Sequence, residues 1–537
     1  MGFFIFFDFL LLHANGMISK NMSQIYLVGG GIASLASAVY LIKDGKIAGK
    51  DIFIFDEAGR LGGSLDAEGS AKNGYMMQGY RMFEEKIYSC TLDLLSHIPG
   101  VHLKSVKDEI LAFNEKNLVH SKSRLVENGK ILNTPSLGLS WKIRSEIFTL
   151  MARNETTLGS SQIKDYFTPA FFKTDFWLEF CTTFAFKPQD SLAELRRYFL
   201  RFIQESPHIN LLTGVRSTPY NQYESIVLPI YNYLSILGVN FKTKCQVTHL
   251  DFEKKNAKHL YYTHDKKSHK ITLSKNDLVL VTAGSMIANF SIGSMTSAPI
   301  LNLKKPTGAW TLWENMAKHH RDFGRPTFFT SQPNKTKLES FTITFKNKIF
   351  IKLLEKLTGN KAGEQGLITF KNSNWLMTVV LPKQPHFINQ PKKVVVAWGY
   401  ALYPDKKGNF VSRKMSECTG EEILTELCLH LGFEKELTKI LKNSICLPCL
   451  MPYGASQFLP RRRGDRPAVV PKGSTNFAFT GQFCEIPEEI AFTVEYSIRS
   501  AQIAVYTLLN LAKKVTPIYH GQNNIKVLFD AFKASLK

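Results

Sequence analysis

A glycine turn between an apolar strand and a helix opens the informative part of the sequence. Residues Ile25–Val28 are a short run of β-forming side chains, Gly29-Gly30-Gly31 follows, and a helical pattern comes next. A second apolar run, Asp51–Phe55, ends on Asp56. This order predicts a βαβ unit. Parallel strands joined through helices assemble into a doubly wound α/β sheet, so a Rossmann-like domain is the expected fold class.

The same turn predicts a dinucleotide site. Glycines at positions 29 and 31 let the backbone approach a pyrophosphate, which then sits at the positive N-terminus of the helix. Ser34 stands where the motif commonly has a third glycine and still allows close helix packing. An acid at the end of the second strand accepts hydrogen bonds from the adenosine ribose. The predicted contacts are Gly29, Gly31, Ile32, Ala33, Ser34, Asp56 and Glu57.

Three later segments resemble flavoproteins of the amine-oxidase and desaturase type. They are Arg60–Gly63, Val281–Ser285 and the turn at Gly481, which precedes a long helical pattern. In such flavoproteins the last turn and helix contact the second phosphate, the ribityl chain and the isoalloxazine. The resemblance therefore implies FAD rather than NAD. It adds the cofactor contacts Gly62, Gly63, Ser64, Arg81, Ser285, Gly481, Gln482 and Glu495.

Changes of pattern divide the chain into seven segments. The FAD-binding domain is expected to be discontinuous, with a separate helical cap and a mixed α+β substrate domain. Residues 1–22 are an N-terminal extension, explained equally by a signal or by a start codon read too early. The others are FAD-binding parts at 23–138, 207–300 and 441–512, a helical cap at 139–206, a substrate domain at 301–440 and a basic amphipathic tail at 513–537.

The net charge and the hydropathy of the chain indicate which kinds of molecule it can bind. The chain has 67 Lys and Arg against 45 Asp and Glu, a net charge of +22, which predicts anionic partners. No nucleic-acid-binding signature occurs, so an anionic membrane surface or an acidic amphiphile is favoured over nucleic acid. No apolar run reaches the roughly 18 residues that span a bilayer. We therefore expect a cytoplasmic protein with peripheral membrane contact, either monomeric or homodimeric.

The tail and the cysteines each leave two interpretations open. Ile525, Phe529 and Phe532 fall at helical spacings, as in an interfacial helix or an ordinary docked terminal helix. Cys446-Leu-Pro-Cys449 has the C-x-x-C spacing of redox and metal sites, but no second ligand pair follows it. Eight scattered cysteines favour a reducing compartment and buried thiols.

Eight short segments, in this order between about residues 24 and 512, resemble the oleate hydratase family, formerly called myosin-cross-reactive antigens. The resemblance implies a lyase that adds water to a cis double bond of an unsaturated fatty acid, with FAD shaping the site and no net electron transfer. The segments are Gly62–Asp66, Gly79–Glu84, Phe184–Phe186, Arg196–Phe202, Tyr220–Tyr223, Gly284–Met286, Met451–Tyr453 and Gly464–Pro467.

Hydration of an isolated alkene needs an acid against one carbon and water at the other. The resemblance implies that Tyr198 is the proton donor. Without the resemblance, Tyr198 would be interpreted as a buried structural aromatic on a helix that carries several arginines. In many family members Glu follows the arginine of the glycine-rich segment, whereas here Met82 follows Arg81. Glu84 and Glu85 are the nearest carboxylates in the sequence and are expected to assist the water.

The fatty acid carboxylate is expected at a polar loop, where the resemblance implies Ser456, Gln457 and Arg461. Gln222 and Tyr223 are expected along the same channel, although each of these residues could equally be a structural turn residue. Two other functions remain open at this level. One is a flavin desaturase or isomerase acting on a fatty acid or isoprenoid, and the other is a lipid-binding protein without activity. The preferred double bond and chain length cannot be read from the sequence.

Overall fold

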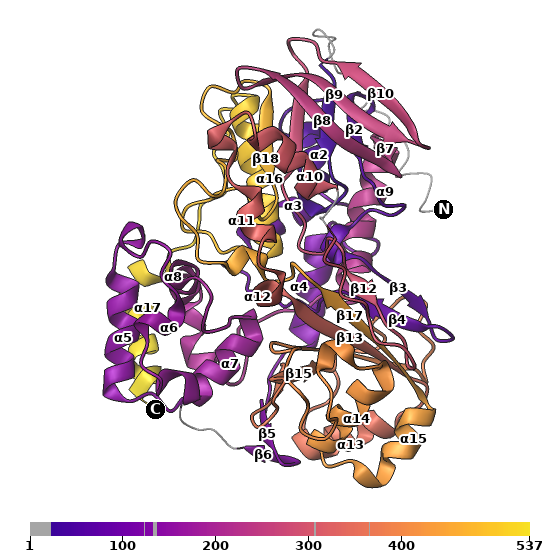
Figure 1. The fold of residues 1–537 in the computed structure, drawn as a ribbon, viewed down its shortest axis with the longest axis vertical. Coiled ribbons are helices and arrows are strands. Elements are labelled where there is room, and N and C mark those ends of the chain that lie inside the picture. Colours follow the sequence, from indigo (N-terminus) through magenta and orange to yellow (C-terminus); the bar gives the residue numbers. More distant parts are fainter. Residues whose placement is uncertain (1–22, 123, 133–136, 305–307, 365, 537) are drawn as a thin grey trace.

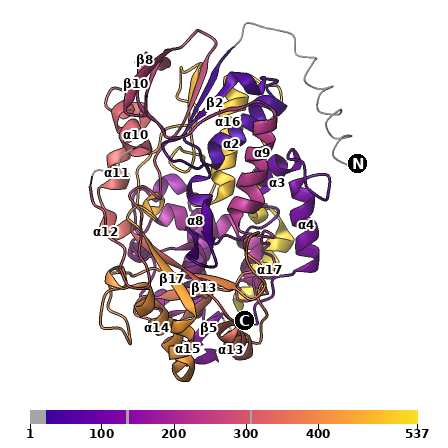
Figure 2. The ribbon, with the colours of Figure 1, turned by 90° about the vertical axis from the view of Figure 1, so that its right-hand side faces the viewer.

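The computed structural model describes residues 23–536 apart from residues 123, 133–136, 305–307 and 365 (Figure 1). The predicted N-terminal extension, residues 1–22, lies outside the described residues. The protein consists of a nucleotide-binding half around a parallel sheet, a second half around a larger sheet, and a helical cap beside both (Figures 1 and 2).

The parallel sheet is assembled from strands that are far apart in the chain. Its order is β18-β11-β1-β2-β7, and all four strand pairs run parallel. Its strands come from three predicted segments, 23–138, 207–300 and 441–512, whose boundaries stay predictions. The strands are β1 (Ile25–Val28), β2 (Ile52–Phe55), β7 (Asn240–Lys242), β11 (Leu278–Thr282) and β18 (Phe477–Thr480).

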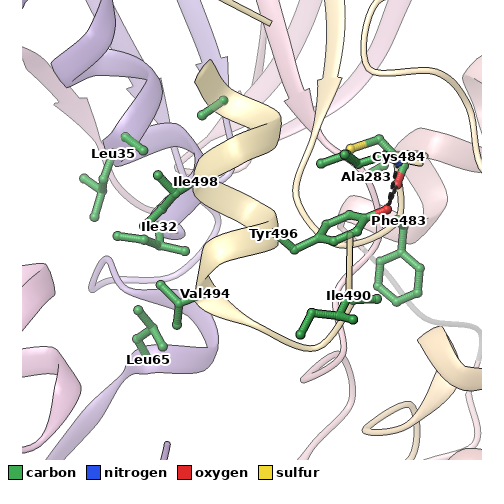
Figure 3. Packing of buried hydrophobic residues seen from close by; sticks show 14 of the residues in the cluster. Ile32, Leu35, Leu65, Ala283, Phe483, Cys484, Ile490, Val494, Tyr496 and Ile498 are labelled. Atoms are coloured by element: carbon green, nitrogen blue, oxygen red, sulfur yellow. Dashed lines mark hydrogen bonds between the residues drawn. The ribbon is translucent and has the colours of Figure 1, made fainter. Parts of the chain in front are cut away.

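Helices cover the sheet and bury strands β1, β11 and β18 almost completely, whereas the edge strand β7 is partly exposed. The glycine turn leads from β1 into α2 (Ile32–Lys43), which packs against α16 (Val494–Leu508). In Figure 3, Ile32 and Leu35 of α2 lie beside Val494 and Ile498 of α16. The neighbouring helices are α3 (Ser89–Ser96), α4 (Val106–Lys116), α9 (Leu228–Ile236) and α10 (Ala309–Ala317). A three-stranded sheet of β8 (Cys245–Glu253), β9 (Asn256–His264) and β10 (Lys267–Thr272) packs on α10.

An eight-stranded sheet forms the second half, in the order β12-β17-β13-β16-β15-β14-β5-β6. Side chains alternate between its faces. On β13, Phe341 and Ile343 enter a hydrophobic core with the helices, whereas Leu338 and Ser340 face a cavity. The strands are β5 (Leu125–Glu127), β6 (Lys130–Leu132), β12 (Ser291–Ile292), β13 (Leu338–Phe345), β14 (Ile368–Phe370), β15 (Met377–Val380), β16 (Val395–Ala401) and β17 (Ser444–Met451). The helices are α13 (Ile349–Thr358), α14 (Gly420–His430) and α15 (Leu437–Lys442).

A short hairpin and two short helices connect the halves. The hairpin of β3 (Ala67–Ser70) and β4 (Gly74–Met77) lies across β13, where the backbone N–H groups of Tyr75 and Met77 donate to the hydroxyls of Thr344 and Thr342 at 2.8 and 3.1 Å. Helices α11 (Pro326–Thr330) and α12 (Pro333–Thr336) precede β13.

The helical cap is completed by the chain's C-terminal helix. Figure 1 shows α17 (Ile525–Leu536) among the cap helices, about 300 residues later in sequence. It packs on the 3-10 helix η5 (Ile203–His208), and Phe532 contacts Phe148 with ring centroids 6.1 Å apart. The cap helices are α5 (Trp141–Ala152), α6 (Ile163–Tyr166), α7 (Asp175–Phe184) and α8 (Leu192–Arg201).

Two sequence expectations about thiols and membranes can be checked directly. All eight cysteines are buried free thiols. Cys446 and Cys449 lie on opposite faces of β17, one in each hydrophobic core, so they cannot act as a C-x-x-C pair. In the described part of the chain, no metal-binding cluster occurs and no helix is long and apolar enough to cross a membrane.

Candidate active site

The glycine turn has an open space in front of α2. Gly29 has a φ of 100°, which favours glycine. A Cβ on Gly30 would lie 2.5 Å from Leu61 Cδ2, whereas a Cβ on Gly31 would meet nothing within 4 Å. Gly31 caps α2 without a side-chain hydrogen bond, so the first N–H groups of the helix remain available to an anion. The turn therefore has the geometry of a phosphate cradle.

A cavity extends from this cradle along the carboxyl ends of the parallel strands. Gln482 contributes an Oε1 atom that is buried without a partner in the described structure, as expected for a group that bonds a ligand. These features fit an FAD molecule. Of the predicted cofactor contacts, the cavity is lined by Gly29, Gly31, Ile32, Ala33, Asp56, Glu57, Gly62, Gly63, Ser64, Ser285, Gly481 and Gln482.

Asp56 also shapes the turn itself. Its carboxylate accepts hydrogen bonds from the backbone N–H groups of Gly30 and Ala58. Burial raises the pKa of Asp56, and these two hydrogen bonds oppose that rise. Glu57 lies in the same wall and accepts a hydrogen bond of 3.2 Å from Gln246. Both acids thus border the place where a ribose would lie.

Three predicted cofactor residues do not line this cavity: Arg81, which lines a second cavity described below, Glu495 and Ser34. The carboxylate of Glu495 accepts hydrogen bonds from the N–H groups of Cys90 and Thr91 at 2.9 and 2.8 Å, which fixes the start of α3. It also pairs with Arg499 at 2.8 Å. Ser34 is buried under the turn. Neither residue lines the nucleotide cavity in the described structure.

A second, mostly apolar cavity lies between the cap and the large sheet, and we call it the substrate cavity. Aromatic side chains such as Phe180 and Phe202 form much of its wall. The two cavities share Gln78 and Met286 in their walls, so they meet there. Gln78 Oε1 is buried without a described partner. An apolar ligand in one cavity would therefore contact a nucleotide cofactor in the other.

Tyr198 lines the substrate cavity from α8. Its side chain is 1% exposed, and its ring lies among those of Phe184, Phe186 and Phe458. The hydroxyl donates a hydrogen bond to the backbone oxygen of Ala491. Burial raises the pKa of Tyr198 well above its usual value, so the phenol is protonated at neutral pH.

The segment after Gly79 reaches the same cavity. Arg81 and Met82 both line it. The guanidinium of Arg81 donates to Ser64 O at 3.1 Å and to Gln222 Oε1 at 3.4 Å, and burial lowers the pKa of Arg81 to about 10. Tyr223, next to Gln222, stacks under the guanidinium of Arg60 with its ring centroid 3.6 Å away. Gln222 and Tyr223 thus lie beside Arg81 and the Arg60–Ser64 loop. They are not among the described lining residues of the substrate cavity.

The two predicted carboxylates lie behind this wall. Glu84 is 6% exposed, and its carboxylate accepts a hydrogen bond of 2.8 Å from the N–H of Ile87. Burial raises the pKa of Glu84 to about 7. Glu85 is partly exposed and pairs with Arg216 at 2.7 Å. Neither occurs among the described residues that line the substrate cavity.

The predicted carboxylate-binding loop is buried in the protein. Ser456 and Gln457 are fully buried, and the guanidinium of Arg461 pairs with Glu194 and Glu485, each at 3.0 Å. Gln457 Oε1 is buried without a described partner. None of the three lines the substrate cavity in the described structure.

Three acidic or basic side chains of the described cavity wall were not foreseen from the sequence. They are Arg144 of α5 and Glu205 and His208 of η5. The spacing Tyr198, Phe202, Glu205 is that of one helical face, which could have indicated Glu205. No comparable signal marks Arg144, whose Nε is buried without a described partner.

The parallel sheet, its glycine turn and the adjoining cavity define a Rossmann-like α/β fold, which the chain shares with solved oxidoreductases. Among solved structures, the cyclohexylamine oxidase of Brevibacterium oxydans aligns with a TM-score of 0.52 at 11% identity, over 91% of this chain and 99% of that chain. An oxidoreductase from Methanosarcina mazei aligns with a TM-score of 0.50 at 13% identity, over 91% and 100%. The predicted fold class is thereby confirmed.

Within this class, the sequence pattern of the MCRA family matches residues 22–506, and the chain belongs to that family. An oleate hydratase from Streptococcus pyogenes serotype M49 (strain NZ131) is 36% identical over 533 residues, which cover 95% of this chain and 89% of that protein. A linoleate hydratase from Lactiplantibacillus plantarum is 32% identical over 540 residues, covering 91% and 94%.

Proposed function

We propose that the protein is an FAD-binding hydratase that adds water to a cis double bond of an unsaturated fatty acid. The observation that carries this proposal is the apolar substrate cavity, which holds the protonated phenol of Tyr198 and adjoins the phosphate cradle. The oleate and linoleate hydratases at 36% and 32% identity support the choice of substrate.

The residues of the cavity have distinct tasks in this reaction. The aromatic wall excludes bulk water and holds the acyl chain, which brings one alkene carbon against the phenol. The hydroxyl of Tyr198 donates its proton to that carbon, and one bound water adds to the other. Because the phenol is protonated at neutral pH, the acid is ready in the resting protein.

FAD fits the cradle at Gly31 and the unpartnered amide oxygen of Gln482. Since hydration involves no net oxidation or reduction, the bound flavin supplies shape and polarity where the two cavities meet. Gln78 and Met286 line both cavities at that point and would contact both the cofactor and the acyl chain. The resemblance assigns the fatty acid carboxylate to the loop of Ser456 and Gln457, which lies outside the described lining of the substrate cavity.

A contact with anionic membranes is the second part of the proposal. On α17, Ile525 is 84% exposed and Phe529 is 63% exposed, while Ala531 of the same helix lines the substrate cavity. The net charge of +22 favours an anionic surface. A helix that is docked on the cap and still exposes apolar side chains can place the cavity next to the lipid that carries the substrate.

The test is incubation of the purified protein with oleate in oxygen-18 water, followed by mass spectrometry. We expect a hydroxy fatty acid that contains the heavy oxygen and forms without consumption of dioxygen. Tyr198→Phe should lower turnover by roughly 10²- to 10⁴-fold while FAD stays bound, as for a lost general acid. A product that needs an electron acceptor would identify a desaturase, and an unchanged fatty acid would identify a lipid-binding protein. A Tyr198→Phe variant with wild-type turnover would reject the assigned acid.

A further inference from the structure

Tyr198 and Glu205 lie on one face of a nearly continuous helical segment. After α8 ends at Arg201, the N–H of Phe202 donates to Tyr198 O and the N–H of Glu205 donates to Phe202 O, each at 2.9 Å. Seven helical residues rise by roughly 10 Å. Both side chains line the substrate cavity, from positions about two turns apart along this segment.

Glu205 provides a carboxylate in this otherwise apolar wall. Among the described residues that line the cavity there is no other Asp or Glu. The carboxylates of Glu84 and Glu85 are held by Ile87 N–H and Arg216, whereas no described residue forms an ion pair or hydrogen bond with the carboxylate of Glu205. It is thus available to a water molecule in the cavity.

The loop against which this carboxylate packs is paired with the segment that carries Met82. Phe83 and Arg216 are joined by two backbone hydrogen bonds of 3.0 and 2.7 Å, so the segment that carries Met82 lies against the loop that ends at Arg216. In that loop, a Cβ added to Gly214 would lie 1.8 Å from Glu205 Oε2. A glycine at this position leaves the space that the carboxylate occupies.

The surroundings of Glu205 leave its carboxylate with a raised pKa, which suits a general base. Burial raises the pKa of Glu205 above its usual value, and Arg216 and Lys86 lower it again. Glu84 lies close enough to interact with it electrostatically. A carboxylate with a raised pKa accepts a proton more readily than an exposed one.

We propose that Glu205 is the base that accepts the proton of the attacking water, a role that the thioether of Met82 cannot fill. This inference rests on the proposed hydratase function. The phenol proton of Tyr198 forms a C–H bond with one alkene carbon, and the water oxygen forms a C–O bond with the other. The water O–H bond breaks and its proton goes to Glu205. Return of that proton to the phenolate of Tyr198 restores both residues, so atoms and charge balance.

The direct test is Glu205→Gln, which keeps the size of the side chain and removes the base. We expect oleate turnover to fall by about 10²- to 10⁴-fold, with FAD content and oleate binding retained. Glu115→Gln, on the exposed face of α4, is the matched control and should turn over like the wild type. Turnover of Glu205→Gln within about twofold of wild type would overturn the inference, because a lost base costs far more.

Gly214→Ala gives a second test that leaves Glu205 in the sequence. The added methyl group would displace the carboxylate, so turnover should fall, and it should fall little further when the change is combined with Glu205→Gln. An undiminished effect of Gly214→Ala in the Glu205→Gln background would contradict the inference. Failure of the proposed function is distinguishable, since the wild type itself would then incorporate no oxygen-18 into a hydroxy acid.

Discussion

At the scale of single residues, Gly31 offers a sharp test of the cofactor site. A Cβ there meets no atom within 4 Å, so Gly31→Trp should fold and fill the space in front of α2. We expect FAD affinity to fall about 10- to 100-fold, equivalent to losing one or two charge-assisted hydrogen bonds at about 1.5 kcal/mol each. Flavin fluorescence titration measures this, with Tyr198→Phe as the control that keeps its affinity. If Gly31→Trp and the wild type bound FAD with equal affinity, the turn at Gly31 would not be the phosphate-binding site.

The residue scale also separates what the sequence could predict from what it could not. Gly29 and Gly31 were identified because a phosphate cradle imposes local spacing, and the structure places both in the nucleotide cavity. Glu84 and Glu85 were chosen for proximity in sequence to Met82. The carboxylate that lines the same cavity as Met82 is instead Glu205, which reaches that cavity from another element. The helical spacing of Glu205 from Tyr198 is a local signal for its face, but it does not reveal that this face lines the same cavity as Met82.

At the scale of elements, a buried charge cluster ties α8 to the segment before α16. Glu485 contacts the guanidinium groups of Arg197 and Arg461 at 2.7 and 3.0 Å. Burial alone would raise the pKa of Glu485, but Arg461, Arg197 and Arg466 outweigh it and lower the pKa to about 2. The cluster holds the helix of Tyr198 in place, and it explains why Arg461 has partners other than a substrate.

This cluster predicts a pH-dependent contribution to stability. Glu485→Gln should lower the free energy of unfolding at pH 7 by about 1 to 2 kcal/mol, a modest value because the side chain is 31% exposed. Because the folded-state pKa is depressed, the contribution is complete above the unfolded value near 4.5 and is lost as pH falls towards 2. The stability difference between the two proteins, measured by urea unfolding at pH 7, 5 and 3, should therefore be similar at pH 7 and 5 and smaller at pH 3. Glu488→Gln, whose side chain is 68% exposed, is the control. A constant difference across this range would contradict the assignment.

Some secondary-structure elements could be predicted from the sequence together with their place in the fold, and others could not. The βαβ unit and the late strand at Leu278–Thr282 follow from apolar runs beside glycine turns, and both are present. The cap was expected from helical periodicity at 139–206, but α17 joins it from the opposite end of the sequence. Periodicity identifies a helix and its apolar side, and it does not reveal which distant surface that side meets.

At the scale of the whole molecule, charge and the exposed side of α17 make a joint prediction about membranes. The net charge of +22 attracts the protein to anionic lipid, and Ile525 and Phe529 offer apolar area for insertion. Co-sedimentation with anionic vesicles should fall on truncation after Pro517 and should weaken with added salt.

Because truncation also removes Ala531 from the cavity wall, the matched variant is Ile525→Ser with Phe529→Ser, which spares the docked side. With about 1.5 kcal/mol or more for each buried side chain, this pair should weaken binding at least about tenfold. Neutral vesicles serve as the control for the charge. Undiminished binding of the truncated protein to anionic vesicles would reject the membrane role of α17.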